Sequence, residues 1–231
     1  MISIIIPTYN EAGTIEDTLE NISNLNTKIE FEIIVADGSS VDSTKEIAEK
    51  YSTVLHSEKG KVIQLNNAFK KSSGDVLFFI PADTTIPEGA LEEIDKRIEE
   101  GFDGGGFSNI FSKNNEKIKL LGRILNLRIF NNDHKNNLIF FGDNGIFCKK
   151  SVFHKLGGFK NIPIMEDYDF SMRMKKSYLS TRILHPKLIV SSRRHLKSGF
   201  IKTRLQWIII RRLYILGVSP KTLIKLYKDV R

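Results

Sequence analysis

Cysteine is almost absent from the sequence. Cys148 is the single cysteine in 231 residues, which excludes an internal disulfide. It lies in the apolar run GIFCKK, where a thiol is more often buried and inert than reactive. We therefore expect Cys148 to be a core residue without chemistry of its own.

Long apolar runs are also missing. No segment reaches the roughly 18 to 20 uninterrupted apolar residues that a membrane span needs. The nearest, residues 207–210, is flanked by arginines. The first residues, MISIIIPTYN, have no basic leader and run directly into a turn, so we interpret them as the first strand. On these grounds we expect a cytoplasmic protein.

Acidic residues are scarce in the last part of the chain. The net charge is +8, and from Arg193 onward Asp229 is the single acid. Such an excess fits an anionic partner, which is a nucleic acid, a phosphorylated substrate or a lipid surface. Residues 201–216 alternate apolar and basic residues at helical spacing. We expect a basic amphipathic helix that packs on the domain or lies on an anionic membrane at its inner face.

The remainder of the sequence predicts one α/β domain. A hydrophobic fraction of 41% and a charged fraction of 27% exclude a disordered chain. Apolar runs at 2–6, 32–36, 53–56 and 76–80 alternate with helical patterns at 14–22, 43–50, 61–71 and 88–100. This alternation predicts a mostly parallel sheet with helices on both faces. Further along we expect strands at 104–106 onward, 140–148 and 182–191, helices at 115–129, 166–177 and 199–216, and a loop at 131–137.

Unusual polar residues follow three of the predicted strands. They lie in residues 7–11, 37–39 and 81–83. Each group alone is explained by a helix cap, a turn or the start of a loop. In open α/β sheets, however, ligands bind beyond the carboxyl ends of the strands. Three such groups at one sheet edge therefore favour a binding site there.

Together these stretches resemble the family 2 glycosyltransferases, which have the GT-A fold. The matching segments are IIIPTYNEAGTIEDTL, EIIVADGSSVDST, GKVIQLNNAF, GDVLFFIPADTTIP and GGFKNIPIMEDYDFSMRMKK, in the family's order and spacing over nearly the whole chain. The resemblance implies an inverting transfer of a sugar from a nucleotide-diphosphate sugar to an acceptor hydroxyl. It also implies a catalytic domain at 1–195, with a nucleotide-binding half (1–100) and an acceptor-binding half (101–195), followed by the tail at 196–231.

The resemblance assigns residues to the donor nucleotide. An aromatic face such as that of Tyr9 can stack on a base, and a carboxylate can accept a hydrogen bond from a base or a ribose. Lys61 and Asn66 correspond to a helix that orders the pocket and the diphosphate. The nucleotide-binding candidates are Pro7, Thr8, Tyr9, Glu11, Asp37, Lys61, Asn66, Ala82 and Asp83.

A divalent metal is the cofactor that the resemblance implies. Asp83 corresponds to the last acid of the family's Asp-x-Asp, but Pro81 replaces the first acid. Mg²⁺ or Mn²⁺ often takes only one or two protein carboxylates and completes its shell with phosphate and water. We expect Asp83 to bind it only weakly without the nucleotide, with His195 as a second ligand candidate. Arg193 and Arg194 are candidates for the diphosphate, because guanidinium groups pair well with phosphate.

An acid pair, Glu166-Asp167, begins a predicted helix. The pair also suits the helix dipole and needs no further role on that ground. The resemblance implies that Asp167 is the general base for the acceptor hydroxyl, with Glu166 as the fallback. Asp143 and Asn144 correspond to the acceptor side, although they equally fit a plain turn.

Two other classes of function, a nucleotidyltransferase and a nucleic-acid-binding module, fit the sequence less well than a glycosyltransferase. A nucleotidyltransferase would need a glycine-rich basic loop after the first strand, and residues 7–10 are not one. In a basic nucleic-acid-binding module, the phosphates of the nucleic acid would meet the acidic residues at the sheet edge that carries the predicted site. This repulsion disfavours a nucleic-acid partner. The sequence does not specify which sugar is transferred or whether the acceptor is lipid-linked or a glycan. It is also compatible with a homodimer.

Overall fold

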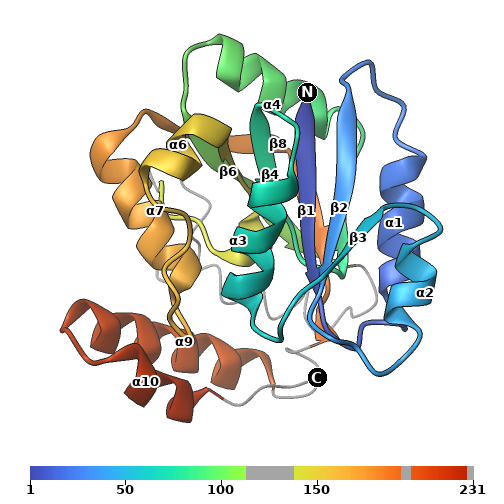
Figure 1. The fold of residues 1–231 in the computed structure, drawn as a ribbon. Coiled ribbons are helices and arrows are strands. Elements are labelled where there is room, and N and C mark those ends of the chain that lie inside the picture. Colours follow the sequence, from blue (N-terminus) through green and yellow to red (C-terminus); the bar gives the residue numbers. More distant parts are fainter. Residues whose placement is uncertain (113–137, 194–198, 228–231) are drawn as a thin grey trace.

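The computed structural model describes residues 1–112, 138–193 and 199–227 (Figure 1). The predicted helix at 115–129 and the loop at 131–137 lie outside this part of the chain. Its first half alternates strands and helices as expected. The bounds are β1 Ile2–Thr8, α1 Ile15–Ser23, β2 Phe31–Asp37, α2 Thr44–Ala48, β3 Thr53–His56, α3 Lys61–Lys71, β4 Val76–Phe79, β5 Thr84–Thr85 and α4 Ala90–Glu99.

The second half contains the remaining described elements. They are β6 Gly104–Phe111, the 3₁₀ turn η1 Gly142–Asn144, β7 Ile146–Lys149, α6 Lys150–Lys155, α7 Glu166–Ser177, β8 Ser180–Val190, α9 Phe200–Ile215, α10 Pro220–Leu223 and the 3₁₀ turn η2 Ile224–Leu226. The strand predicted over 140–148 is therefore wrong in its first part. A turn comes first because Gly145 adopts a positive φ of 57° and the Asn144 backbone amide donates to the Phe141 carbonyl at 2.9 Å. The remaining strand begins only at Ile146.

The described strands form one sheet in the order β3-β2-β1-β4-β7-β6-β8-β5. The neighbours from β3 to β4 are all parallel, as predicted, whereas β7 is antiparallel to both β4 and β6. The parallel register pairs Thr8 with Asp37 at the carboxyl edge. Two groups of polar residues that are far apart in sequence are thereby brought side by side.

Helices cover both faces of the sheet, as the alternating pattern predicted. Apolar residues of α1 and α4, such as Leu19 and Ile94, pack with Ile4 on one face. Residues of α3, α6 and α7 pack with Ile5 on the other. Alternate residues of β1 thus face opposite layers, which is the two-residue period of a strand buried on both sides. Cys148 is buried in the second layer, which confirms it as a core residue.

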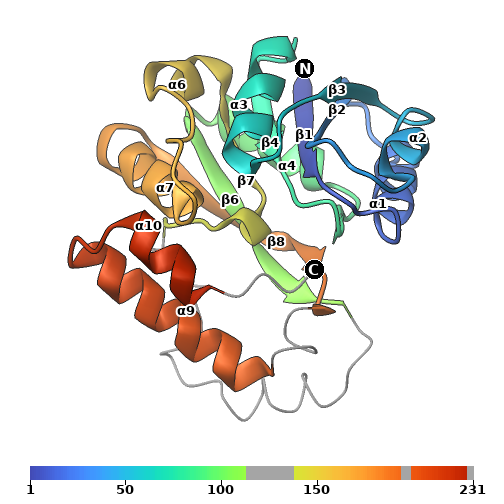
Figure 2. The ribbon, with the colours of Figure 1, turned by 60° about the horizontal axis from the view of Figure 1, so that its bottom comes forward.

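The carboxyl end of the chain forms a helical layer at one end of the sheet. Figures 1 and 2 show α9 and α10 beside each other below α7. Ile210 and Leu223 of this layer are buried against Ile164, Met165 and Tyr168. The tail thus packs on the domain, which is one of the two expected arrangements. Within the described ranges, none of the helices has both the length and the apolar character that crossing a bilayer requires.

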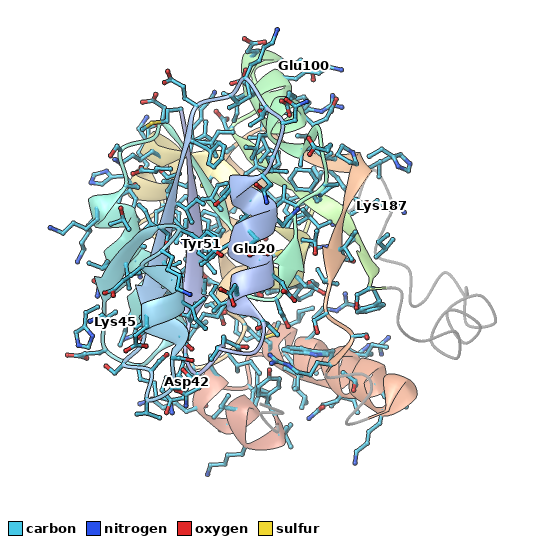
Figure 3. The ribbon with its side chains drawn as sticks, turned by 90° about the vertical axis from the view of Figure 1, so that its right-hand side faces the viewer. Glu20, Asp42, Lys45, Tyr51, Glu100 and Lys187 are labelled. Atoms are coloured by element: carbon cyan, nitrogen blue, oxygen red, sulfur yellow. The ribbon has the colours of Figure 1, made fainter. Side chains whose placement is uncertain are left out.

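Figure 3 distinguishes the two ends of the molecule. Asp42, in the turn before α2, lies at the end that carries α9 and α10, whereas Glu100 lies at the opposite end. Away from both, the Tyr51 hydroxyl donates to Glu20 Oε1 at 3.1 Å and links α1 to the residues after α2. The carboxyl ends of the parallel strands point toward the end with Asp42, where the polar groups gather.

Candidate active site

A cavity of about 930 Å³ is lined by the carboxyl ends of β1 and β4 and by residues of α9, of η2 and just after η2. Its lining comes from the first strand, the start of α3, the start of α7 and the end of β8. Twelve of the residues predicted for the site line it: Pro7, Thr8, Tyr9, Glu11, Lys61, Ala82, Asp83, Asp143, Asn144, Glu166, Asp167 and Arg193. One cavity therefore joins the predicted donor residues to the predicted base.

Asp37 lies behind this cavity and does not line it. Its carboxylate is only 2% exposed and accepts hydrogen bonds from Thr8 Oγ1 at 3.1 Å and from the Ser40 amide at 2.9 Å. The hydroxyl of Ser40 also donates to it at 2.5 Å. In this structure Asp37 fixes the loops after β1 and β2.

Gln64 is a site residue that the sequence did not single out. Its amide nitrogen donates to the carbonyl oxygens of Thr8 at 2.6 Å and Ala36 at 2.7 Å, and the side chain is buried. It therefore ties the ends of β1 and β2 to α3. A usable signal was present, because Gln64 interrupts an otherwise apolar helix face formed by Val62, Leu65 and Ala68.

The first charged group in the cavity, here called the arginine cluster, consists of Glu11, Asp83 and Arg193. The Arg193 guanidinium contacts Glu11 Oε2 at 3.2 Å through both terminal nitrogens and Asp83 Oδ2 at 3.6 Å. Burial raises the pKa of Asp83, Arg193 opposes that rise, and the charge of Glu11 adds to it. The carboxylate that was predicted to meet the metal is thus already paired with a cation.

The second charged group, here called the lysine cluster, consists of Lys61, Glu166 and Asp167. Lys61 Nζ lies 2.6 Å from Glu166 Oε1 and 3.9 Å from Asp167 Oδ2. The Gly142 amide donates to Asp167 Oδ2 at 2.7 Å, and the Tyr168 amide donates to Oδ1 at 2.7 Å. Lys61, predicted for the nucleotide, is therefore held by the acid pair in this structure.

The charges of this cluster oppose one another. Burial and the neighbouring Glu166 raise the pKa of Asp167 to about 6, although Lys61 and the two amides act against the rise. Burial would lower the pKa of Lys61, but Glu166 and Asp167 raise it above its ordinary value. A carboxylate that titrates near neutral pH within a cavity is suited to accept a proton.

Met165 sets the direction of the acid pair. It caps α7 in the left-handed region at φ 69°, which is uncommon for a side chain of this size. The strained cap is held because Met165 is buried, at 1% exposure, against Ile210 and Leu223. The C-terminal helices thereby support the residues that carry Glu166 and Asp167.

Similarity to known proteins agrees with this geometry. The profile described as Glycosyl transferase family 2 matches residues 3–157, which is more than half of the chain. The chain belongs to glycosyl transferase family 2. The family resemblance seen in the motifs is thereby confirmed.

Relatives within the family match only over part of their length. Dolichol-phosphate mannosyltransferase of Pyrococcus furiosus is 33% identical over 109 residues, covering 44% of this chain and 31% of that protein. Probable glycosyltransferase YdaM of Bacillus subtilis is 26% identical over 193 residues, covering 75% of this chain and 46% of that protein. The matched part of this family 2 chain therefore spans about a third of the first relative and less than half of the second.

Solved structures show the same fold. Mannosyltransferase PcManGT from Pyrobaculum calidifontis, in complex with GDP-Man and Mn²⁺, superposes with a TM-score of 0.68 at 20% identity, covering 95% of this chain and 66% of that one. S. aureus TarS 1-349 in complex with UDP-GlcNAc gives 0.68 at 18% identity, covering 97% and 70%. The predicted GT-A fold is confirmed by these matches.

The wall opposite the family 2 motifs was not predicted. It consists of residues from the C-terminal helices: Trp207, Ile208, Arg211, Ile224 and Tyr227. The rings of Trp207 and Tyr227 are 5.4 Å apart, centre to centre. The sequence predicted only that the tail packs on the domain or on a membrane. Trp207 and Tyr227 lie among basic residues of the tail, and this pattern could have indicated that the tail also lines a binding cavity.

Besides Asp37, one other described residue among those predicted for the site is absent from the cavity lining. That residue is Asn66. Its amide donates to the Phe159 carbonyl at 2.8 Å and accepts from the Phe159 amide at 3.0 Å, so it joins α3 to the loop before α7. Both polar atoms of its side chain are used in these two hydrogen bonds, and its role toward the nucleotide stays a prediction. Arg194 and His195 lie outside the described residues.

The acceptor-side pair divides into two roles. Asn144 is buried, and its side chain accepts from the Phe141 amide at 3.0 Å and donates to the Phe107 carbonyl at 3.1 Å. Asn144 therefore stabilises the turn, in agreement with the alternative that residues 143–144 form a plain turn. Asp143 is exposed at the cavity, and its backbone carbonyl accepts from Asn109 at 2.8 Å.

The residues around Asp83 fit a metal ion only together with a phosphorylated ligand. The described part of the chain contains no group of three or more His, Cys, Asp or Glu side chains that could hold a metal. Asp83 supplies one carboxylate at the cavity, and Mg²⁺ or Mn²⁺ is often held by one or two carboxylates plus substrate phosphates. Asp83 thus suits a metal that arrives with a nucleoside diphosphate.

Proposed function

We propose that this protein is an inverting glycosyltransferase that moves a sugar from a nucleotide-diphosphate sugar to an acceptor hydroxyl. The observation that supports it most is that one cavity joins the ends of β1 and β4 to a half-buried carboxylate, Asp167. We keep 1–195 as the catalytic domain, with its donor half at 1–100 and its acceptor half at 101–195. The tail at 196–231 closes the cavity in this proposal.

The donor binds at the arginine cluster and the ends of β1 and β4. Thr8, Tyr9 and Glu11 face the nucleoside. Arg193 binds the diphosphate, whose oxygens compete with Glu11 and Asp83 for the guanidinium. Asp83 holds a divalent metal together with the diphosphate. When bound, the metal would act as a Lewis acid and neutralise charge on the departing nucleoside diphosphate.

Transfer is a single displacement. Asp167 takes the proton from the acceptor hydroxyl while the hydroxyl oxygen forms a bond to the anomeric carbon. The bond from that carbon to the diphosphate oxygen breaks on the opposite face, and the electron pair leaves with the nucleoside diphosphate. The anomeric configuration inverts. Asp143, exposed at the same cavity, is placed to contact acceptor hydroxyls.

The relatives support this donor and one class of acceptor. The two solved structures named above were obtained with GDP-Man and Mn²⁺ and with UDP-GlcNAc, which supports a nucleotide sugar and a divalent metal here. A Campylobacter jejuni relative named GalNAc(5)-diNAcBac-PP-undecaprenol beta-1,3-glucosyltransferase is 29% identical over 110 residues. Its name supports a lipid-linked acceptor for this chain.

A lipid-linked acceptor requires contact with a membrane, which we place on the outer face of α9. Lys202, Leu205, Ile209, Arg212 and Leu216 are all exposed and recur at helical spacing. Apolar and basic side chains on one face favour an anionic lipid surface. We therefore propose a cytoplasmic protein that binds the inner face of the membrane peripherally.

The donor is tested by calorimetric titration of UDP, GDP, CDP and dTDP, each with and without Mn²⁺. We expect one nucleotide to bind with an affinity that depends on the metal. The titration is repeated on Asp83→Asn and on Asp42→Asn, a carboxylate at the same end of the molecule that does not line the cavity (Figure 3). Absence of binding by every nucleotide would refute the donor and with it the proposed function.

Membrane contact is tested by flotation with phosphatidylglycerol and phosphatidylcholine vesicles. We expect flotation with the anionic vesicles alone, and its loss in the double variant Leu205→Ser, Ile209→Ser. The matched control is Val41→Ser, which changes a residue that is 86% exposed outside α9. Equal flotation of both variants would exclude α9 as the membrane-binding face.

A further inference from the structure

The position of Lys61 differs from that of an ordinary diphosphate ligand. It is the first residue of α3, and its ammonium lies at hydrogen-bond distance from Glu166 rather than pointing toward the arginine cluster. Its side chain is 44% exposed, whereas those of Glu166 and Asp167 are 10% and 16% exposed. A solvent-reaching cation therefore covers two largely buried carboxylates.

Such a pair of carboxylates needs a counter-charge. Two neighbouring carboxylates withdrawn from water repel each other, and one of them then retains a proton near neutral pH. Lys61 supplies a positive charge to both, at 2.6 Å from Glu166 and 3.9 Å from Asp167. The Gly142 and Tyr168 amides add one hydrogen bond to each oxygen of Asp167. The cluster is thus built to hold Asp167 as an anion in one orientation.

The two acids are not equivalent within this arrangement. Glu166 Oε1 is engaged by Lys61 at 2.6 Å, the shortest contact of the cluster. Each oxygen of Asp167 has one amide partner and keeps its second lone pair for another donor. Asp167 is therefore the acid whose two oxygens are oriented by backbone amides, whereas Glu166 is the acid that holds the lysine.

We propose that Lys61 is a positioning residue that keeps Asp167 ionised and oriented, and that Glu166 anchors Lys61 instead of acting as a second base. The catalytic consequence rests on the proposed function, because it takes Asp167 as the base. The ionisation of Asp167 can be measured without any substrate.

Other charged and titratable groups of the described residues act on the cluster or line the same cavity. Tyr227, after η2, acts on Lys61 and helps to raise its pKa. Arg211 of α9 and Asp143 of η1 line the same cavity. These groups stay in place in every variant used below, so a change in the titration of Asp167 reports on Lys61 or Glu166.

The test is a pH titration of side-chain carboxyl ¹³C signals of labelled aspartates, with Asp167 assigned by its absence in Asp167→Asn. We expect Lys61→Met to move the Asp167 midpoint upward by about one pH unit or more, as loss of a nearby opposite charge does. Lys61→Arg should restore most of the wild-type midpoint. Glu166→Gln should move it downward, because one repelling carboxylate is removed while the remaining amide oxygen can still accept a hydrogen bond from Lys61. Lys70→Met, at an exposed position on the same helix, should change nothing.

The activity readout is the pH profile of nucleoside diphosphate release from the nucleotide sugar selected by calorimetry. A base must be deprotonated, so activity falls as the pH drops through its pKa. With Lys61→Met this acid limb should move to higher pH, while the affinity for the nucleoside diphosphate stays within about threefold, a small difference in free energy.

Three results would overturn the assignment. An unchanged Asp167 midpoint in Lys61→Met, accompanied by weaker nucleotide binding, would make Lys61 a diphosphate ligand. Loss of activity in Glu166→Gln as complete as in Asp167→Asn would make Glu166 the base. If Lys61→Met fails to fold, an unchanged or higher midpoint in Glu166→Gln would still refute the proposal. Failure of the proposed function would appear separately, as absence of nucleotide binding by the wild type.

Discussion

The cavity contains two charged clusters of the same composition and different construction. The arginine cluster and the lysine cluster each combine two carboxylates with one cation. In the lysine cluster both acids are consecutive on α7, and the cation begins a helix. In the arginine cluster the three residues come from three distant parts of the sequence, and Arg193 follows the end of β8.

This difference indicates different functions. A helix start fixed by packing suits a group that must keep its position throughout a reaction. An arginine beyond a strand end, which stays charged at any ordinary pH, suits an exchange of carboxylate partners for phosphate. The comparison predicts that ligands rearrange the arginine cluster and leave the lysine cluster in place.

The largest expected effect comes from Asp167→Asn. The substitution removes the proton acceptor while retaining the size of the side chain, and general base catalysis is typically worth about 10² to 10⁴-fold. We expect a loss of kcat in that range, measured as nucleoside diphosphate release with acceptor. Affinity for the nucleotide should be unchanged in calorimetry. A loss of affinity equal to the loss of rate would instead place Asp167 in donor binding.

Asp83→Asn should be next in size and should affect the other cluster. Removing a carboxylate that holds a metal should weaken metal-dependent nucleotide binding by roughly 10 to 100-fold, the scale of losses around metal sites. The measurement is nucleotide affinity as a function of Mn²⁺ concentration, with Asp42→Asn as the matched control. Wild-type metal dependence in Asp83→Asn would show that the metal is held elsewhere.

Arg193→Gln should have an effect of about tenfold. A hydrogen bond to a charged group contributes about 1.5 to 3 kcal/mol, and 1.4 kcal/mol corresponds to a factor of ten in affinity. The loss should be larger for the nucleoside diphosphate than for the nucleoside monophosphate, because Arg193 faces the diphosphate in our proposal. Arg212→Gln, at an exposed position on α9, is the control. Equal losses for both nucleotides would contradict the exchange of partners.

The smallest effect is expected for Gly142→Ala. A Cβ at this position would lie 3.0 Å from Lys61 Nζ and 3.5 Å from Asp167 Oδ2. The flexible lysine can yield, so we expect a loss of kcat of roughly tenfold or less, below the hundredfold that a 1 Å misplacement can cost. Thermal unfolding should change little. A fully active variant would show that the position of Lys61 is not critical for Asp167.

The gathering of site residues could be predicted from the sequence wherever a strand end carried them. Pro7, Thr8 and Asp83 follow apolar runs, and the carboxyl ends of parallel strands share one edge. Asp167 was proposed as the base through the family resemblance, because the acid pair follows the GGF segment in the family's order. Each of these features lies within a short stretch of sequence, so its prediction does not depend on how distant elements pack.

The partners of these residues could not be predicted. Lys61 was expected at the diphosphate, but its reach toward α7 depends on how α3 and α7 pack on the same sheet face. Asn66 bonds to Phe159, more than ninety positions along the chain, and nothing in the sequence indicated that partner. Trp207 enters the cavity wall only because α9 folds back across the sheet end. Contacts of this kind are properties of the tertiary arrangement.

The placement of Trp207 has a practical consequence. It is the only tryptophan in the sequence, it lines the cavity, and Tyr227 is its ring neighbour. Its ultraviolet emission is therefore a single-site signal from the cavity itself. A molecule that enters or reorders this wall will change the intensity or the wavelength of that emission, so occupancy can be followed optically on the unlabelled protein.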